Sequence, residues 1–207
     1  VNNKIPYELT DVVKKGMTTS QKNIKYIVTS VKASNRTVAI TGVLNKNVSS
    51  INIPGTIKIN GKTYKVTAVA DRAFKNNKKL TKITIGKNVK KIGNSAFANC
   101  TKLTAITLGG QVQTIGKSAF SGCTKLAKLT LGKKVKTIDR KAFYGCKKLT
   151  KITIQTSKLT TKSVGSKAFT GVSKKAKVYL PKKNAKAYKK LLKSKGLSTK
   201  VKYQNIK

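Results

Sequence analysis

Cysteine has the clearest capacity for chemistry in this chain, and its spacing is regular. Cys100, Cys123 and Cys146 lie 23 residues apart, which is neither a metal-ligand spacing nor a scattered disulfide framework. We interpret them as small buried side chains that face the next unit of a repeat. Free cysteine is among the most buried residue types, and Val172 takes the same place in the last unit.

Two alternatives would use these thiols. If successive repeat units stack about 4.8 Å apart, the Cα atoms of neighbouring cysteines come close enough for a disulfide. Their side chains would point in the same direction, however, which is a poor geometry for the S–S bond. A metal site with three thiolates would spread its ligands through successive units of a dry core. The sequence therefore predicts no metal site.

The chain lacks the residues that most enzyme mechanisms require. The chain has no histidine, and its four acids are too far apart in sequence to indicate a carboxylate pair: Glu8, Asp11, Asp71 and Asp139. A phosphate loop of the G-x-x-x-x-G-K-S/T type is absent. A serine and lysine nucleophile pair stays open only because both residues are abundant. We therefore expect a protein that is not an enzyme and has no cofactor.

The charge of the chain is extreme. It has 47 lysines and arginines against four acids in 207 residues, a formal net charge of +43, and only Arg36, Arg72 and Arg140 are arginines. Such a surface attracts polyanions, an anionic cell wall or an anionic membrane. Alternatively, the lysines keep an extended molecule soluble, and composition alone does not decide between these interpretations.

The sequence predicts no membrane span, because no stretch approaches 18 apolar residues. The chain starts at Val1 with neither an initiator methionine nor a signal peptide. This start indicates a mature piece whose targeting segment is missing.

The elements that position these residues repeat along the chain. The pairs Ala96-Phe97, Ala119-Phe120 and Ala142-Phe143 recur with a period of 23, which is typical of a solenoid. Every phenylalanine falls in one column of this repeat: Phe74, Phe97, Phe120, Phe143 and Phe169. Further apolar columns hold Leu80, Leu103, Leu126 and Leu149, and the pairs Ile83 and Ile85, Ile106 and Leu108, Leu129 and Leu131, Ile152 and Ile154, Val178 and Leu180.

Each unit combines two periodicities. The L-x-x-I-T-I/L segment alternates with period two, which predicts a strand that stacks in parallel on its neighbours with Ile83 and Ile85 inward and Thr84 outward. The A-F-x-x-C-x-x-L segment has apolar residues three apart, a helical or 3₁₀ spacing. One coil is therefore predicted as a strand, a glycine turn, a short extended piece and a helical turn.

The ends of the repeat differ from its middle. Residues 24–65 contain two hairpin patterns, one of them around Asn60 and Gly61, and are predicted to cap the first coil. Residues 1–23 are predicted to be a leader or linker. They could contain a short helix at 7–15, be flexible, or be the tail of an upstream domain. Three extra residues near 155–163 predict a surface bulge.

After Pro181 we expect an amphipathic helix with Asn184 at its start and Gly196 just beyond its end. Together with a tail at residues 201–203 it would close the C-terminal end.

The repeat pattern I-G-x-x-A-F-x-x-C-x-x-L-x-x-I-x-L and the ending Val178 to Pro181, followed by a helix with tyrosine and lysine, resemble the BspA-type leucine-rich repeat family of bacterial cell-surface proteins. The resemblance covers roughly residues 24–203. The chain departs from the commoner leucine-rich repeat in having Gly86, Gly109 and Gly132 directly after the strand. The resemblance implies an extracellular or wall-associated location and adhesive or recognition roles, and it implies no catalytic residue.

We therefore predict a β-rich α/β solenoid, a leucine-rich repeat with parallel strands, about five coils of 23 residues, an N-terminal β cap and a C-terminal helix cap. The predicted divisions are a leader at 1–23, the cap at 24–65, the solenoid at 66–181, and a closing helix and strand at 182–207.

The outward side chains are the remaining candidates for function. The candidate ligand face consists of Lys82, Thr84, Thr107, Lys128, Thr130, Lys151 and Thr153, and a second basic row of Lys79, Lys102, Lys125 and Lys148. Threonine also favours strands and lysine also favours solubility, so these residues alternatively have no ligand.

We expect a monomeric, non-enzymatic cell-surface recognition or adhesion module that binds a host glycoprotein, an anionic glycan or a wall polymer through this face. The partner would be a host or microbial surface protein or an anionic polysaccharide. Nucleic acid would bind only non-specifically, because arginine, the preferred guanine reader, is scarce and the phenylalanines are assigned to the core. The alternative is a structural spacer that presents or anchors neighbouring domains.

Overall fold

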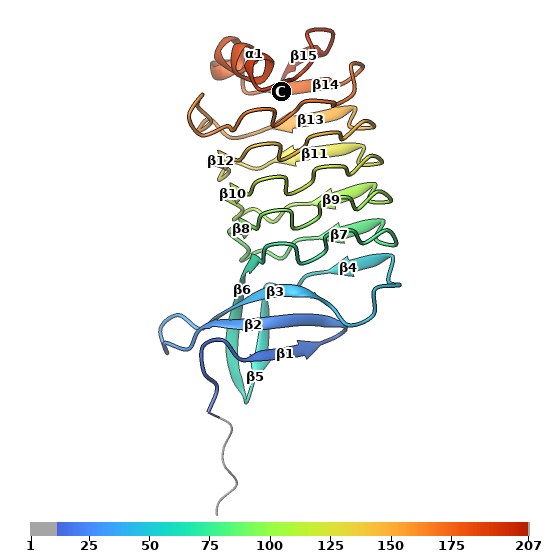
Figure 1. Cartoon of the computed structure of the whole chain (residues 1–207). Coiled ribbons are helices and arrows are strands. Elements are labelled where there is room, and N and C mark those ends of the chain that lie inside the picture. Colours follow the sequence, from blue (N-terminus) through green and yellow to red (C-terminus); the bar gives the residue numbers. More distant parts are fainter. Residues whose placement is uncertain (1–11, 207) are drawn as a thin grey trace, which may run out of the picture.

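The structure is a computed structural model, and it describes residues 12–206. The chain winds into a stack of short coils, with antiparallel strands at the N-terminal end and one helix at the C-terminal end (Figure 1). Two sheets run along the stack. This arrangement confirms the predicted solenoid of parallel strands.

One sheet carries the strand of each coil. Its seven strands are all parallel: β4 (Ser50–Asn52), β7 (Lys82–Thr84), β9 (Ala105–Thr107), β11 (Lys128–Leu131), β13 (Lys151–Ile154), β14 (Lys177–Leu180) and β15 (Lys202–Asn205). The stack is thus longer than the predicted five coils. Residues 50–52, assigned to the cap, and the C-terminal tail each add a strand, because the end coils otherwise expose unpaired backbone groups.

The second sheet joins the cap to the coils. It contains β1 (Thr18–Gln21), β2 (Ile24–Ser30), β3 (Thr37–Val43), β5 (Thr56–Ile59), β6 (Lys62–Val69), β8 (Lys91–Ile92), β10 (Thr114–Ile115) and β12 (Thr137–Ile138). β1, β2 and β3 pair antiparallel, as do β5 and β6, whereas β3 pairs parallel to β6 and so starts the parallel part.

Both predicted hairpins are confirmed. Asn60 and Gly61 connect β5 to β6 with φ of 46° and 71°, the positive values that a type I′ turn requires. A further hairpin lies in the segment predicted as a leader, where residues 18–21 form β1. The helix expected at 7–15 falls partly outside the described residues, and residues 12–15 are not helical. The domain boundaries stay a prediction.

The phenylalanine column forms the centre of the core. All five rings stack nearly parallel, with centroids 5.1 to 5.5 Å apart. The leucine column and the inward strand residues are buried beside them, except that Ile106 and Leu108 are only partly buried. The prediction that both of these side chains are buried is therefore wrong for this coil. In the same coil β9 pairs with β11 at a single position, Ala105 with Lys128.

The predicted helical turn in each coil is wrong. Its residues form consecutive turns in which Ser95 and Asn99, and their equivalents in other coils, have positive φ. Alternate amides then point in different directions: Phe97 donates to Ala119 O in the next coil, while Cys100 donates to Phe97 O in its own. A helix would satisfy all these amides internally, so the turns allow the coils to bond to each other on this side as well.

Helix α1 (Ala185–Ser194) follows a single 3₁₀ turn at Lys182–Asn184. Asn184 is its N-cap residue as predicted, although its side chain makes no capping hydrogen bond. Gly196 has φ of 94°, and the amides of Gly196 and Leu197 donate to Lys193 O and Leu192 O, which is a Schellman ending. Within residues 12–206 no helix is long and apolar enough to cross a membrane.

The insertion at 155–163 does not simply bulge into solvent. Thr156 and Leu159 are buried, and the Thr156 hydroxyl donates to Val135 O at 2.7 Å. The Tyr188 hydroxyl of α1 donates to Thr156 O at 3.0 Å and accepts from Leu159 N at 3.1 Å. The helix therefore holds the insertion in place, which corrects the predicted surface bulge.

Candidate ligand-binding face

The outer surface of the seven-stranded sheet, called here the strand face, carries two columns of side chains. The first residue of each strand forms the lysine column: Ser50, Lys82, Ala105, Lys128, Lys151, Lys177 and Lys202. The third residue forms the threonine column: Asn52, Thr84, Thr107, Thr130, Thr153, Tyr179 and Gln204. Alternation along each strand directs both columns away from the core.

Four lysines are consecutive in the first column. Lys128 pairs with Lys151, Lys151 with Lys177, and Lys177 with Lys202, and all four are exposed. Neighbouring strands lie about 4.8 Å apart, and at about 4 Å two unit charges in water repel by about 1 kcal/mol. The row therefore repels itself and attracts a polymer with repeated negative charge.

The structure places all seven predicted face residues in these two columns. The face is interrupted in its middle, because Ala105 replaces lysine and Thr107 has no register partner on β11. The lysines of the predicted basic row are all exposed and lie in the turns three residues before their strands: Lys79, Lys102, Lys125 and Lys148.

Sequence reasoning missed the C-terminal part of the face. Lys177, Tyr179, Lys202 and Gln204 continue the columns on β14 and β15. These residues do not follow the 23-residue period, because Lys177 comes 26 residues after Lys151. The alternation around Val178 and Leu180, both inward, was the signal that could have found Lys177 and Tyr179.

A hollow of about 470 Å³ lies at this C-terminal part of the strand face. It is lined by Lys151, Thr153, Tyr179, Gln204, Asn205 and Ile206. The Lys151 ammonium lies 5.2 Å from the centroid of the Tyr179 ring, within the range of a cation–π contact.

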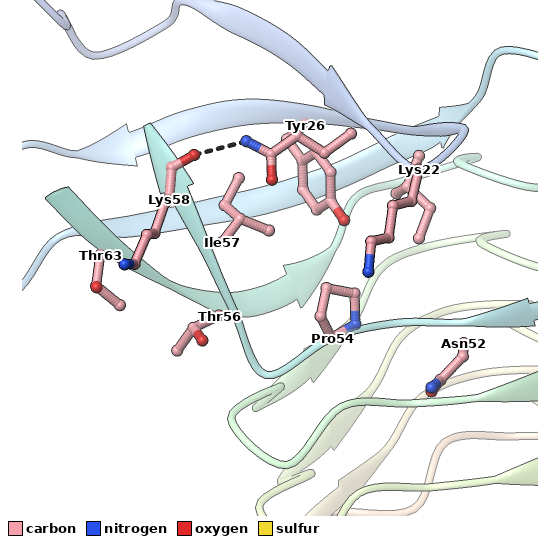
Figure 2. Close-up of a pocket in the computed structure, with 10 residues that line it drawn as sticks. Lys22, Tyr26, Asn52, Pro54, Thr56, Ile57, Lys58 and Thr63 are labelled. Atoms are coloured by element: carbon pink, nitrogen blue, oxygen red, sulfur yellow. Dashed lines mark hydrogen bonds between the residues drawn. The ribbon is translucent and has the colours of Figure 1, made fainter. Parts of the chain in front are cut away.

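A second hollow, of about 600 Å³, lies in the N-terminal cap. Figure 2 shows Tyr26, Pro54 and Ile57 inside it, between Lys22 and Lys58. The Gln21 side-chain amide donates to Lys58 O at 2.6 Å and links β1 to the β5 strand. Burial raises the pKa of Tyr26 to about 12. None of the residues predicted for the ligand face lines this hollow.

The cysteine column is buried as predicted, and its thiols are free. Each Sγ lies within hydrogen-bonding distance of a phenylalanine carbonyl of the preceding coil, as with Cys123 and Phe97 O at 3.1 Å. Burial raises the pKa of Cys100 and Cys146 to about 12. Neutral, enclosed thiols are poor nucleophiles, and among residues 12–206 no group of three or more histidine, cysteine or acidic residues could hold a metal ion.

The two described acids act in turns. The Asp71 carboxylate accepts from the Asn94 backbone at 2.7 Å and from its amide at 3.1 Å, and Asp139 accepts from the Arg140 backbone at 2.6 Å. The other two acids, Glu8 and Asp11, lie outside the described residues. The structure therefore brings no described carboxylate to the strand face.

The repeat units match a known protein family. The sequence profile described as "BspA type Leucine rich repeat region" matches residues 67–198 in six copies. The chain belongs to the BspA-type leucine-rich repeat family. This match confirms the resemblance inferred from the sequence. The matched residues include five of the seven strands of the strand face: β7, β9, β11, β13 and β14.

Solved structures of bacterial proteins share the fold. The pneumococcal vaccine antigen PcpA is 29% identical with a TM-score of 0.68, over 82% of this chain and 45% of that one. A leucine-rich repeat protein of Bacteroides ovatus is 26% identical with a TM-score of 0.57, over 79% of this chain and 47% of the other. A leucine-rich cell surface protein of Faecalibacterium prausnitzii is 24% identical with a TM-score of 0.51, over 80% and 55%. The chain thus spans about half of each of these proteins.

No curated protein sequence matches the chain. Folds of this family are typically non-enzymatic modules for protein interaction or for structural support. Among the similar structures, one is named as a cell surface protein and one as a vaccine antigen. These findings indicate a module for interaction or for structural support.

Proposed function

We propose that this BspA-type chain is a non-enzymatic recognition module outside the cell or in the wall, and that its strand face binds an anionic polymer. The polymer is a glycan of a host glycoprotein, a free anionic polysaccharide or an anionic wall polymer. The observation that carries the proposal is the unbroken register of Lys128, Lys151, Lys177 and Lys202 on one exposed face.

The chemistry of lysine suits such a ligand. An ammonium is a compact point charge on a flexible stem, so it can follow anionic groups whose spacing is irregular. The charge of the whole molecule adds long-range attraction and a fast encounter. Neighbouring threonine hydroxyls on the same face can donate to and accept from a hydroxyl-rich ligand.

The test compares two variants with the same change in net charge. In the face variant, glutamine replaces Lys128, Lys151, Lys177 and Lys202. In the control variant, glutamine replaces four exposed lysines outside the seven-stranded sheet: Lys90, Lys117, Lys136 and Lys190. Binding to immobilised heparin and to teichoic acid is measured by surface plasmon resonance across a salt series. We expect at least about a tenfold loss for the face variant, about twofold for the control, and a steep decline with salt.

Two outcomes contradict this proposal. Equal losses in both variants would mean that net charge, and not the strand face, drives association. A wild-type chain that binds neither polymer at low salt would instead favour the structural spacer.

A further inference from the structure

The threonine column contains one aromatic side chain, and a hollow coincides with it. From Thr84 to Thr153 the described column holds only threonine, but on β14 its member is Tyr179. The ring is half-buried and forms part of the lining of the 470 Å³ hollow. The Tyr179 ring therefore adds a flat apolar surface to a column whose other side chains are small and polar.

A cation lies over this ring, and polar residues line the same hollow. The Lys151 ammonium is held 5.2 Å from the ring centroid, and Lys177 and Lys202 precede Tyr179 and Gln204 by two residues on the same strands. Thr153, Gln204 and Asn205 also line the hollow. Hydroxyl and amide groups both donate and accept hydrogen bonds, as sugar hydroxyls do.

The combination matches an anionic sugar. The face of an aromatic ring is negative, so it attracts the weakly positive C–H groups on the flat side of a pyranose. The Lys151 ammonium lies over the ring, so a pyranose packed against the part of the ring that this ammonium leaves free would bring its carboxylate or sulfate to Lys151. Successive bases of a nucleic acid require several stacking platforms, and the described threonine column offers only one.

We propose that Tyr179 is the stacking platform of a sugar subsite, which takes one carboxylated or sulfated pyranose of an anionic polysaccharide. This subsite rests on the proposed function of the strand face and specifies its ligand. Lys151 supplies the charge contact, and Thr153, Gln204 and Asn205 supply hydrogen bonds to the sugar hydroxyls.

The experiment separates the ring from the charge. Tyr179→Ala and Tyr179→Phe are compared with Tyr144→Ala, which removes a matched aromatic: Tyr144 is exposed and has the Lys141 ammonium 5.5 Å from its ring centroid, but lies outside the seven-stranded sheet. The probes are a heparin-derived oligosaccharide, an inorganic polyphosphate and an oligothymidylate of equal charge. Affinities are measured by isothermal titration calorimetry with the whole chain.

We expect Tyr179→Ala to weaken oligosaccharide binding about three- to tenfold and to change polyphosphate and oligothymidylate binding less than about twofold. Tyr179→Phe retains the ring and should retain the wild-type affinity. Tyr144→Ala should change none of the three. Thermal unfolding of each variant, followed by circular dichroism, shows whether the fold is intact.

The subsite is overturned if Tyr179→Ala weakens polyphosphate binding as much as oligosaccharide binding, or leaves both unchanged. An equal loss for oligothymidylate would overturn it as well, because the ring would then stack on bases. A loss in Tyr179→Phe as large as in Tyr179→Ala would assign the effect to the hydroxyl. If the four-lysine face variant still loses affinity in these cases, the proposed function stands while the subsite fails. If that variant behaves like its control, the proposed function fails.

Discussion

At the scale of single residues, the cysteine thiols link neighbouring coils, as backbone hydrogen bonds do elsewhere in the stack. The Phe97 carbonyl accepts from Cys100 N in its own coil and lies 3.1 Å from the Cys123 Sγ of the next coil. The same arrangement joins Cys146 to Phe120 O at 3.2 Å. Each thiol therefore links two coils as a weak donor in the neutral state, without a disulfide.

This burial predicts a pH dependence of stability to which each cysteine contributes, and replacing one cysteine should reduce it. Burial raises the pKa of Cys146 from about 9 to about 12. Below about pH 9 the thiol is protonated in both states and has no effect. Between about pH 9 and 12 the unfolded chain releases a proton that the folded chain retains, so stability falls as pH rises, by at most about 1.4 kcal/mol per unit.

The measurement is urea unfolding of the wild type and Cys146→Val from pH 7 to pH 11. Valine is chosen because Val172 occupies the same place in the last coil. The free energy of unfolding should decline more steeply in the wild type above about pH 9. Parallel curves would show that the thiol is already exposed or ionised in the folded chain.

At the scale of elements, the last coil depends on helix α1. The insertion interrupts the 23-residue period, and the Tyr188 hydroxyl bonds two backbone groups within it, Thr156 O and Leu159 N. Tyr188 is 2% exposed, so water cannot replace these bonds without local opening. The helix therefore closes the apolar end of the stack and also orders the loop that leads from β13 to Val164.

Tyr188→Phe should lower the free energy of unfolding by about 1 to 3 kcal/mol, because it leaves two buried backbone groups unpaired at almost constant volume. The Leu159 amide should also exchange with solvent faster, as followed by hydrogen–deuterium exchange. Tyr144→Phe removes the hydroxyl of an exposed tyrosine and serves as the control, with an expected change below about 0.5 kcal/mol. If the free energy of unfolding changed equally little in both variants, the Tyr188 hydroxyl would not hold the insertion in place.

At the scale of the whole molecule, stacking and charge oppose each other. Five coils each contribute a phenylalanine, and buried aliphatic side chains join these rings in one continuous core. The chain carries 47 basic residues and only four acids to offset them. Repulsion between like charges destabilises the compact state. The stack folds because apolar burial between coils exceeds this repulsion.

Screening should therefore stabilise the free protein. The thermal midpoint is expected to rise when sodium chloride increases from about 0.01 M to about 0.15 M, since the Debye length shortens from about 30 Å to about 8 Å. Differential scanning calorimetry measures this rise, and the four-lysine face variant should show a smaller one. A midpoint that falls with salt would mean that attractive charge contacts dominate the fold. Binding of a polyanion, in contrast, should weaken over the same range.

Much of the fold could be predicted from the sequence because the relevant forces act locally. The period of 23 aligned Phe74, Phe97 and Phe120 into one column, and alternation around Thr84 indicated which side of the strand faces outward. Asn60 and Gly61 predicted their hairpin through the φ values that the turn requires. These inferences need only a residue and its neighbours along the chain.

What only the tertiary structure decided depends on pairing between distant segments. Residues 50–52 and 202–205 join the seven-stranded sheet because it offers unpaired backbone groups at both ends. A strand in the C-terminal tail was predicted, but its pairing with the repeat strands was not. The predicted helical turns became open turns because alternate amides, such as Phe97 N, find partners in the next coil. The meeting of Tyr179, Lys151 and Gln204 likewise follows from register across an irregular interval. Side-chain direction is a local property of a strand, whereas register is settled only when coils bond to one another.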